Sequence, residues 1–236
     1  VKYTGKNIVL ATGSYPKTLP GLDIDGTQII TSEQAISMDR VPKSVIVLGG
    51  GVIGCEFASV WKSFGAEVTI IEGLPHLIAL EDESSSKLLE RAFRKRGIKF
   101  ELGVRFKSHK VNGDSVTVTL EDGREFTADV LLVSVGRGPV TDGIGYQELG
   151  ITMDRGYITV DDHCRTNIPG VWAVGDIIPT LQLAHVGFQE GILVAETIAG
   201  LNPRPINYDG VPRVTYSEPE VASVGLSTKV AKERGY

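Results

Sequence analysis

The sequence predicts an α/β fold built on a parallel β-sheet, with an antiparallel meander added to it. Apolar runs of strand length at residues 44–48 and 67–71 flank a helix-like stretch at residues 52–64. A second helix-like stretch, residues 83–95, leads to another strand at residues 99–102. Parallel strands need a long crossover connection, usually a helix, so two successive strand–helix–strand steps indicate a doubly wound sheet.

The meander is predicted from three segments with alternating apolar residues between residues 105 and 127. Asn112-Gly113-Asp114 and Asp122-Gly123 separate these segments, and glycine turns of this kind favour β-hairpins. We therefore expect an antiparallel sheet with one exposed face. An apolar strand at residues 129–135 follows and is expected to be buried.

Shorter elements are expected on either side of this sheet. A stretch with proline and glycine up to Gly26 looks like a crossover between domains. The expected elements are a buried strand at residues 7–11, a short capped helix at 32–36, strands at 157–160 and 171–174, a helix at 185–199, strands at 211–216 and 221–224, and a helix from 227 onward.

Composition and charge exclude several classes of protein. Hydrophobic residues make up 42% of the 236 residues, which is enough for a packed core. The net charge of −5 offers no basic face for nucleic acid, and the densest basic run, residues 91–99, is most simply the solvated face of a helix. The apolar side of that helix would carry Leu88, Leu89, Ala92 and Phe93. No segment has the apolar length of a membrane span, and no signal peptide is visible.

Two cysteines, Cys55 and Cys164, lie far apart in the sequence and form no CxxC or other close pair. His163 beside Cys164 suggests a thiolate pair, but neighbours on a strand point to opposite faces. We expect both cysteines to be structural, because a free cysteine usually behaves as a small hydrophobic residue. Scattered cysteines also fit a reducing compartment.

A glycine turn, residues 49–54, joins the strand at 44–48 to the following helix. A lone glycine turn often does no more than connect strand to helix, but the strand, helix and acid that surround this one favour a dinucleotide-binding unit. Backbone N–H groups and the helix dipole would hold a pyrophosphate there. A side chain at Gly49 or Gly51 would block that approach, and one at Gly54 would push the helix from the strand.

Glu72 ends the next strand, where an acid is expected to accept hydrogen bonds from an adenosine ribose diol. A carboxylate would repel the 2′-phosphate of NADP. Gly73-Leu74-Pro75 offers no arginine to bind that phosphate. Glu72 therefore favours NAD over NADP.

Six motifs occur in order along the chain. They are IVLATGS at residues 8–14, GGGVIGCE at 49–56, VGR at 135–137, TNIPGVWAVGD at 166–176, QLAH at 182–185 and VTYSEPEVA at 214–222. Together they resemble the flavoprotein disulfide reductases with two dinucleotide-binding folds, and most closely the bacterial dihydrolipoamide dehydrogenase branch. The resemblance covers nearly the whole chain. Both ends fall within element-like runs, so a fragment of a longer protein is expected.

The resemblance implies an arrangement of domains. Residues 22–143 would form a Rossmann-like NAD-binding domain inserted into an FAD-binding domain of related fold. The FAD domain would comprise residues 1–21 and 144–208. Residues 209–236 would begin the interface domain through which the family forms homodimers.

On the FAD side, the resemblance implies that Asp176 binds a ribitol hydroxyl of the flavin. An acid after a parallel strand also faces the ligand crevice, although a helix cap or turn is the alternative. The helix that starts at residue 184 would point its N-terminus at the flavin pyrimidine edge and stabilise negative charge there. We expect no acid–base role for His185. The implied FAD residues are Thr12, Gly13, Ser14, Asp176, Gln182, Leu183, Ala184 and His185. The alternative for residues 12–14 is a plain crossover turn, which they would form in any case.

On the NAD side, Glu56 would orient the nicotinamide end, or it is simply a charged residue near the helix start. Ile53 would wall the nicotinamide site. Phe106 matches a position near the adenine only loosely, and a core aromatic is the alternative. The implied NAD residues are Gly49, Gly50, Gly51, Val52, Ile53, Gly54, Glu56, Glu72, Phe106 and Gly136.

The reaction implied by the resemblance is NAD-dependent oxidation, through FAD, of dihydrolipoamide carried on a lipoyl domain of a 2-oxo acid dehydrogenase complex or the glycine cleavage system. A bacterial cytoplasmic homodimer is implied as well. The chain contains no close cysteine pair, no FAD fingerprint and no complete His–Glu dyad, so no catalytic residue is assigned and the polypeptide alone is expected to be inactive. The alternatives are a mercuric reductase, a CoA-disulfide reductase, an NADH oxidase or a non-catalytic nucleotide-binding module.

Overall fold

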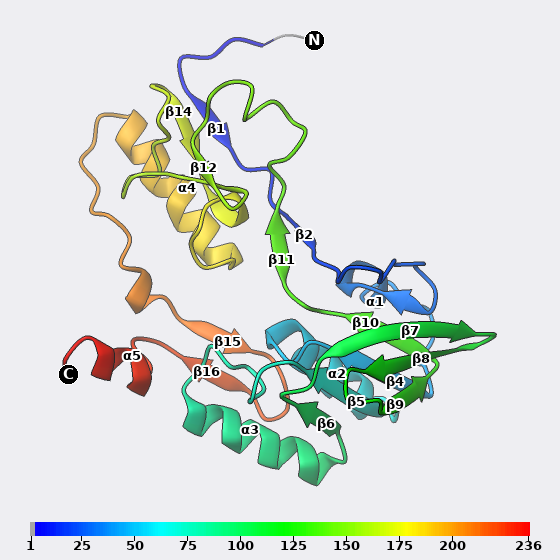
Figure 1. Ribbon diagram of the computed structural model, residues 1–236. Helices are drawn as coiled ribbons and strands as arrows, with labels where there is room; N and C mark the ends of the chain where they lie inside the picture. The colour runs from blue at the N-terminus through cyan, green and yellow to red at the C-terminus, as the bar shows by residue number, and fades with distance from the viewer. Residues whose placement is uncertain (1–2) are drawn as a thin grey trace. The chain divides into compact units, whose positions relative to one another are not determined.

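The computed structural model describes residues 3–236, which form two compact units (Figure 1). The first unit contains the chain up to Tyr15 together with Arg137–Val211, and the second contains Pro16–Gly136 together with Pro212–Tyr236. The expected domain boundaries at residues 21, 143 and 208 remain predictions.

A five-stranded parallel sheet with the order β3-β10-β4-β5-β6 forms the centre of the second unit. Its strands are β3 (Ile29–Ile30), β4 (Ser44–Leu48), β5 (Glu67–Glu72), β6 (Lys99–Leu102) and β10 (Val130–Val133). Helices α2 (Val52–Ser63) and α3 (Glu83–Arg96) connect β4 to β5 and β5 to β6. The two predicted strand–helix–strand steps are therefore confirmed.

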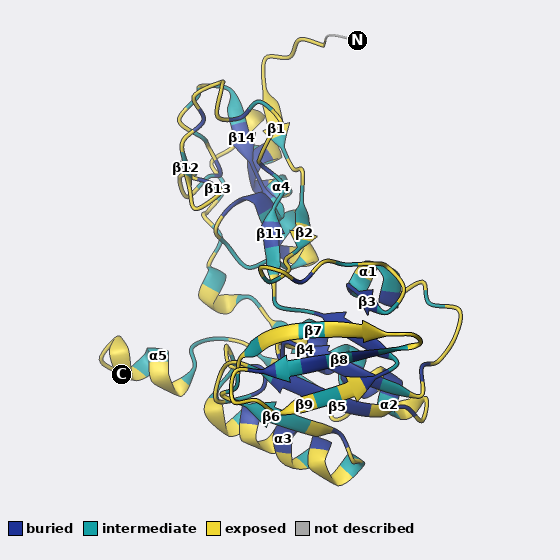
Figure 2. Ribbon diagram, turned by 45° about the vertical axis from the view of Figure 1, so that its right-hand side comes forward, coloured by how far each residue is buried: buried dark blue, intermediate teal, exposed yellow. Residues whose placement is uncertain are grey.

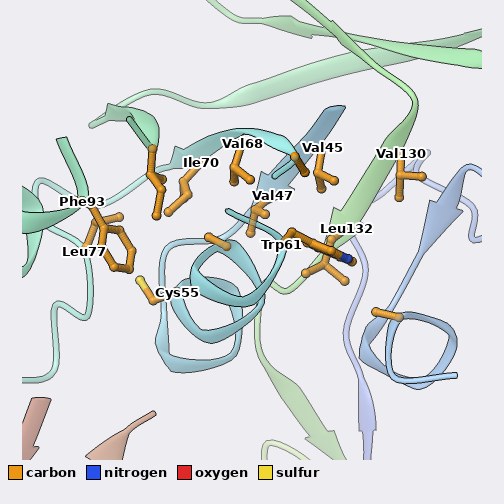
Figure 3. Close-up of a cluster of buried hydrophobic side chains, with 14 of the residues drawn as sticks. Val45, Val47, Cys55, Trp61, Val68, Ile70, Leu77, Phe93, Val130 and Leu132 are labelled. Atoms are coloured by element: carbon orange, nitrogen blue, oxygen red, sulfur yellow. The ribbon is translucent and has the colours of Figure 1, made fainter. Parts of the chain in front are cut away.

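The two faces of this sheet are covered differently. On one face, side chains of β4 and β5 pack against Cys55 and Trp61 of α2 and Phe93 of α3, all buried (Figure 3). On the other face lies the predicted meander, β7 (Phe106–Asn112), β8 (Ser115–Leu120) and β9 (Glu125–Ala128). Alternate residues of β8 are buried, whereas β7 is largely exposed (Figure 2). The expected exposed face of the meander is confirmed.

Local signals set the helix ends. Thr31 caps the short helix α1 (Ser32–Ala35), and Gln34 completes the capping box. The helix α3 ends at Gly97 with φ 77°, a left-handed conformation that glycine adopts without strain.

The basic helix α3 differs from expectation in two respects. Leu89 and Phe93 are buried, but Leu88 is 67% exposed because it lies one residue away from the buried stripe. Arg96 is not simply solvated, since its guanidinium donates hydrogen bonds to Ser59 Oγ and to the carbonyl of Glu218, each at 2.7 Å. Arg96 of the basic run thus links α3 to α2 and to a later segment through hydrogen bonds.

That later segment holds β15 (Arg213–Thr215), β16 (Val221–Ser223) and α5 (Thr228–Glu233). The two strands pair antiparallel. Arg213 pairs with the nearly buried Glu81, and the backbone N–H of Thr228 donates to Asp82 at 2.8 Å. These polar contacts hold the segment against the rest of the second unit.

The first unit contains short paired strands and one long helix. Its strands are β1 (Ile8–Leu10), β2 (Ser14–Pro16), β11 (Arg137–Pro139), β12 (Met153–Asp154), β13 (Tyr157–Ile158) and β14 (Val171–Ala173). Helix α4 (Ala184–Ile198) and the single-turn 3₁₀ helices η1 (Gly175–Ile177) and η2 (Tyr208–Gly210) follow. The core gathers Trp172, Ala173, Ile177, Leu193 and Val194.

The sequence predicts a buried strand at residues 7–11. The strand is present as β1, but the expectation that it is buried is wrong. Ile8 and Val9 of β1 are 50% and 46% exposed. Among the described strands, β1 pairs only with β14, in parallel, so much of its surface stays uncovered.

Candidate nucleotide sites

The glycine turn between β4 and α2 lies beside the end of β10. Strand β4 has β5 on one side and β10 on the other. Ser134 follows β10, and its hydroxyl donates a hydrogen bond shared between the carbonyl oxygens of Leu48 and Gly49. Its Oγ lies 3.1 Å from each of them. The carboxyl ends of β4 and β10 therefore meet where the strand order reverses, which is the position at which open α/β sheets bind ligands.

The glycines of the turn differ in what a side chain at each position would meet. A Cβ at Gly54 would lie 1.9 Å from the carbonyl oxygen of Gly49, so the helix packs directly on the turn as expected. At Gly49 the reason differs from the expected one: φ is 108°, and a Cβ would lie 2.3 Å from the carbonyl of Ser134. A Cβ at Gly51 would meet nothing within 4 Å. Gly51 thus leaves open the side from which a diphosphate would approach the helix.

Glu72 lies against this turn. Its Oε2 accepts a hydrogen bond from the N–H of Gly50 at 2.5 Å, and its Oε1 accepts one from the N–H of Leu74 at 2.7 Å. A carboxylate offers about four acceptor positions, so two are left for a ribose diol. The predicted acid is held by the backbone beside the predicted phosphate turn.

The N-terminus of α2 has no side-chain cap, because Gly51 is its N-cap residue. Backbone N–H groups of Val52 and Ile53 in the first turn can therefore serve an anion, with the helix dipole adding to the attraction. Val52 is 40% exposed and Ile53 is half-buried. The open end of the helix fits a diphosphate.

Three other predicted NAD residues have additional partners. Glu56 accepts a hydrogen bond from the N–H of Tyr216 at 2.9 Å. Phe106 is partly buried against the meander-side core and stacks on His109, with ring centroids 6.3 Å apart. Gly136 has φ 114° and its carbonyl accepts from the N–H of Lys17. The packing of Phe106 supports the core alternative, and its role near an adenine stays a prediction.

In the first unit, Asp176 is held by two residues from distant parts of the chain. Ser14 Oγ donates a hydrogen bond to Oδ2 of Asp176. Arg137 donates from Nε to Ser14 Oγ at 2.6 Å and from Nη2 to the Ser14 carbonyl at 2.7 Å. Its Nε is 4.0 Å from Oδ2 of Asp176. The structure therefore brings together two predicted FAD residues.

Sequence reasoning missed the part that Arg137 has in this network. The available signal was its place in the VGR motif directly after a strand. Thr12 and Gly13 have structural partners, since Thr12 Oγ1 donates to the Val140 carbonyl at 2.5 Å and the Gly13 carbonyl accepts from the N–H of Val140. Those bonds fit the crossover-turn alternative and leave Ser14 as the residue nearest the predicted acid.

The start of α4 provides an open helix end in the first unit. Leu183 is the N-cap residue and makes no side-chain cap bond, and Ala184 and His185 are exposed. The Nε2 of Gln182 is buried and has no hydrogen-bond partner among residues 3–236. A buried donor without an acceptor is costly, so this amide fits a polar ligand such as the flavin pyrimidine ring.

Both cysteines are free and buried, as expected. Burial raises the pKa of the Cys55 thiol to about 12, and nearby carboxylates act in the same direction. Burial likewise raises the pKa of the Cys164 thiol to about 12. Neither residue has the low pKa of a redox-active thiolate.

No helix among residues 3–236 combines the length and the apolar character that crossing a membrane requires. Within the same residues, no group of His, Cys, Asp and Glu is arranged to hold a metal ion.

The parallel sheet, its switch point and the glycine turn define an α/β protein with the architecture of a dinucleotide-binding fold. Residues 1–191 match the sequence profile of the family described as pyridine nucleotide-disulphide oxidoreductase. The chain belongs to this family.

Similar proteins agree with this assignment. Dihydrolipoyl dehydrogenase of Bacillus subtilis is 41% identical over 236 residues, covering 98% of this chain and 50% of that protein. The mitochondrial dihydrolipoyl dehydrogenase of Schizosaccharomyces pombe is 44% identical over 236 residues, covering 98% of this chain and 46% of that protein. The chain spans about half the length of the curated relatives it matches.

Solved structures show the same fold. LpdA from Mycobacterium tuberculosis has a TM-score of 0.90 at 33% identity, covering 97% of this chain and 50% of that one. The HOCl-induced flavoprotein disulfide reductase RclA from Escherichia coli has a TM-score of 0.91 at 27% identity, covering 100% of this chain and 55% of that one. Family membership and the similarity to a flavoprotein disulfide reductase imply FAD and NAD as cofactors.

Proposed function

We propose that this chain is the nucleotide-handling part of a dihydrolipoyl dehydrogenase, which oxidises protein-bound dihydrolipoamide and reduces NAD⁺ to NADH through FAD. Relatives that carry this name are 41% and 44% identical over almost the whole chain. The observation that best supports NAD binding is the hydrogen bond from Gly50 of the glycine turn to Glu72. This bond lies next to an open helix N-terminus.

The NAD site comprises the residues at the carboxyl ends of β4 and β5. Gly51, Val52 and Ile53 present the turn and the helix N–H groups to the diphosphate. Glu72 accepts from the adenosine ribose and disfavours a 2′-phosphate. The remaining proposed residues are Gly49, Gly50, Gly54, Glu56, Phe106 and Gly136.

The FAD site comprises Asp176 and the start of α4. The carboxylate of Asp176 accepts from the ribitol, while Gln182 and the helix N-terminus face the pyrimidine edge. Bound FAD supplies the two-electron relay between thiols and NAD. The other proposed residues are Thr12, Gly13, Ser14, Leu183, Ala184 and His185.

No catalytic residue is proposed within these 236 residues, because the two cysteines are separate, buried and of high pKa. The purified polypeptide alone is expected to show no turnover with dihydrolipoamide. Steady-state turnover would contradict this part of the proposal.

The proposed partners are NAD(H), the lipoyl domain of a 2-oxo acid dehydrogenase complex or the glycine cleavage system, and a second copy that pairs through the interface domain begun by residues 209–236. The relatives' name supports the lipoyl partner. A cytoplasmic location is proposed because both cysteines are free, which fits a reducing compartment.

The test is a pair of titrations, with NADH and with NADPH, each monitored by nucleotide fluorescence with and without added FAD. We expect NADH to bind and NADPH to bind at least about tenfold more weakly, because a 2′-phosphate next to Glu72 faces a like charge. Equal affinity for the two nucleotides, or no binding of either, would reject the proposed NAD site. NADH binding with no FAD binding would favour the alternative of a nucleotide-binding module.

A further inference from the structure

Glu190 is a fully buried carboxylate in the second turn of α4. It is 0% exposed and accepts three hydrogen bonds. The N–H of Gly175 donates to Oε2 at 2.6 Å, and the hydroxyls of Thr180 and Tyr208 donate to Oε1 at 2.8 and 3.0 Å. All three partners are neutral donors, and a buried carboxylate is tolerated only when its oxygens are hydrogen-bonded in this way.

The three donors come from three different segments of the first unit. Gly175 opens η1, the turn that presents Asp176. Thr180 lies in the loop that leads to Gln182 and the start of α4. Tyr208 opens η2. One carboxylate therefore joins both parts of the proposed FAD site.

The helix also packs closely on the Asp176 turn. A Cβ at Gly187 would lie 3.6 Å from the Cα of Gly175, which is ordinary van der Waals contact, so the backbone of α4 lies close to this turn. Burial, and then the charge of Glu190, raises the pKa of the Tyr208 hydroxyl, which consequently stays protonated and donates. Glu190 thus links the Asp176 turn, the Thr180 loop and Tyr208 through hydrogen bonds.

We propose that Glu190 is a positioning residue for FAD: it holds the Asp176 turn at a set distance and orientation from the N-terminus of α4. It acts through Gly175 and Thr180 and does not itself touch the flavin. This inference rests on the proposed function, because it assumes that Asp176 and the helix start share one ligand.

Two substitutions of Glu190 separate geometry from charge. Glu190→Leu removes the acceptor that the three partly buried donors share. Glu190→Gln keeps one carbonyl oxygen for the N–H of Gly175, and its amide can donate to the two hydroxyls once they rotate. We expect Glu190→Leu to weaken FAD binding by at least about tenfold, while Glu190→Gln restores it to within about threefold.

Hydrogen exchange of the protein without FAD gives a second measurement. Peptides covering residues 174–184 should exchange at least about tenfold faster in Glu190→Leu and close to the wild-type rate in Glu190→Gln. Glu196→Leu, on the same helix, is the matched control and should change neither FAD affinity nor exchange in this loop. NADH affinity, which belongs to the second unit, should stay unchanged in all variants.

If Glu190→Leu does not fold, Thr180→Val and Tyr208→Phe each remove one donor. Thr180→Val should weaken FAD binding more than Tyr208→Phe, because only Thr180 lies in the loop that leads to the helix start. Wild-type affinity and exchange in Glu190→Leu, or equal effects of the two hydroxyl substitutions, would overturn the inference. Failure of the wild type to bind FAD would instead reject the proposed FAD site, and the exchange measurement would still decide whether Glu190 holds the turn.

Discussion

Gly50 donates its backbone N–H to Oε2 of Glu72, with 2.5 Å between the nitrogen and the oxygen. The glycine turn after β4 and the acid at the end of β5 therefore form one hydrogen-bonded unit. The other carboxylate oxygen accepts from Leu74, so the carboxylate cannot rotate away without losing two bonds. The proposed nucleotide preference and the shape of the turn therefore depend on the same side chain.

Glu72→Gln should weaken NADH binding and reduce the preference for NADH over NADPH. An amide can accept from only one of the two N–H groups, and it has no charge to oppose a 2′-phosphate. We expect NADH affinity to fall about tenfold to a hundredfold, the equivalent of about 1.5–3 kcal/mol for a hydrogen bond to a charged group. Parallel titrations with both nucleotides check this, with the exposed Glu67→Gln on the same strand as control. An unchanged preference for NADH over NADPH would show that Glu72 does not determine nucleotide specificity.

Gly51→Ala and Gly54→Ala should separate nucleotide binding from folding. A methyl group at Gly51 meets only open space, so thermal stability should change little while NADH binding falls. A methyl group at Gly54 would meet the Gly49 carbonyl at 1.9 Å, which should cost about 2–3 kcal/mol of unfolding free energy. Denaturant unfolding and NADH titration of both variants provide the test. NADH binding of wild-type strength by a folded Gly51→Ala variant would place the diphosphate elsewhere.

Neither cysteine should react with a thiol reagent at pH 8 while the protein is folded. Burial raises the pKa of each thiol to about 12, and both side chains are nearly or fully inaccessible. Ellman's reagent should modify no cysteine in the native protein and both after denaturation in guanidinium chloride. Rapid modification of one cysteine without denaturant would reopen the question of a redox role.

His163 should make stability depend on pH. Its Nδ1 lies 2.7 Å from a carboxylate oxygen of Asp162 and its Nε2 lies 3.2 Å from the carbonyl of Pro203, so only the protonated ring donates to both. The hydrogen bond that the His163 ring donates to the Asp162 carboxylate is the main cause that raises the pKa of His163 above its ordinary value of 6.5.

The raised pKa sets the direction of the pH effect. The stabilisation is fully present below pH 6.5 and is lost as pH rises through the higher pKa of the folded state. Melting temperature should therefore fall as the pH rises from 6 toward 8, and Asp162→Asn should flatten that slope. A melting temperature that rises over this range, with the same slope in Asp162→Asn, would contradict the assignment.

Elements governed by local patterns were predicted well. The helix expected at residues 52–64 is found at Val52–Ser63, and the one expected at 83–95 is found at Glu83–Arg96. Apolar periodicity and terminal glycines are local signals, so they need no knowledge of the partner surface. The glycine turn and Glu72 were also predicted, because both lie directly at strand ends.

Features that depend on distant contacts were missed. The exposure of strand β1 depends on which surfaces cover it, and an apolar run in the sequence carries no such information. Arg137 and Glu190 gain their roles only when Ser14, Gly175 and Thr180 are brought beside them. The sequence alone does not distinguish a charged residue that becomes buried from one that stays exposed.

By itself, the sequence determined the two strand–helix–strand steps, the glycine turn with its acid, and the family resemblance, because each depends on residue types and their spacing along the chain. Tertiary structure alone decided that Glu72 binds the turn through Gly50, that Asp176 is held by Ser14, and that Glu190 joins three segments. Hydrogen bonds between residues far apart along the chain exist only after folding has placed donor and acceptor within about 3 Å of each other.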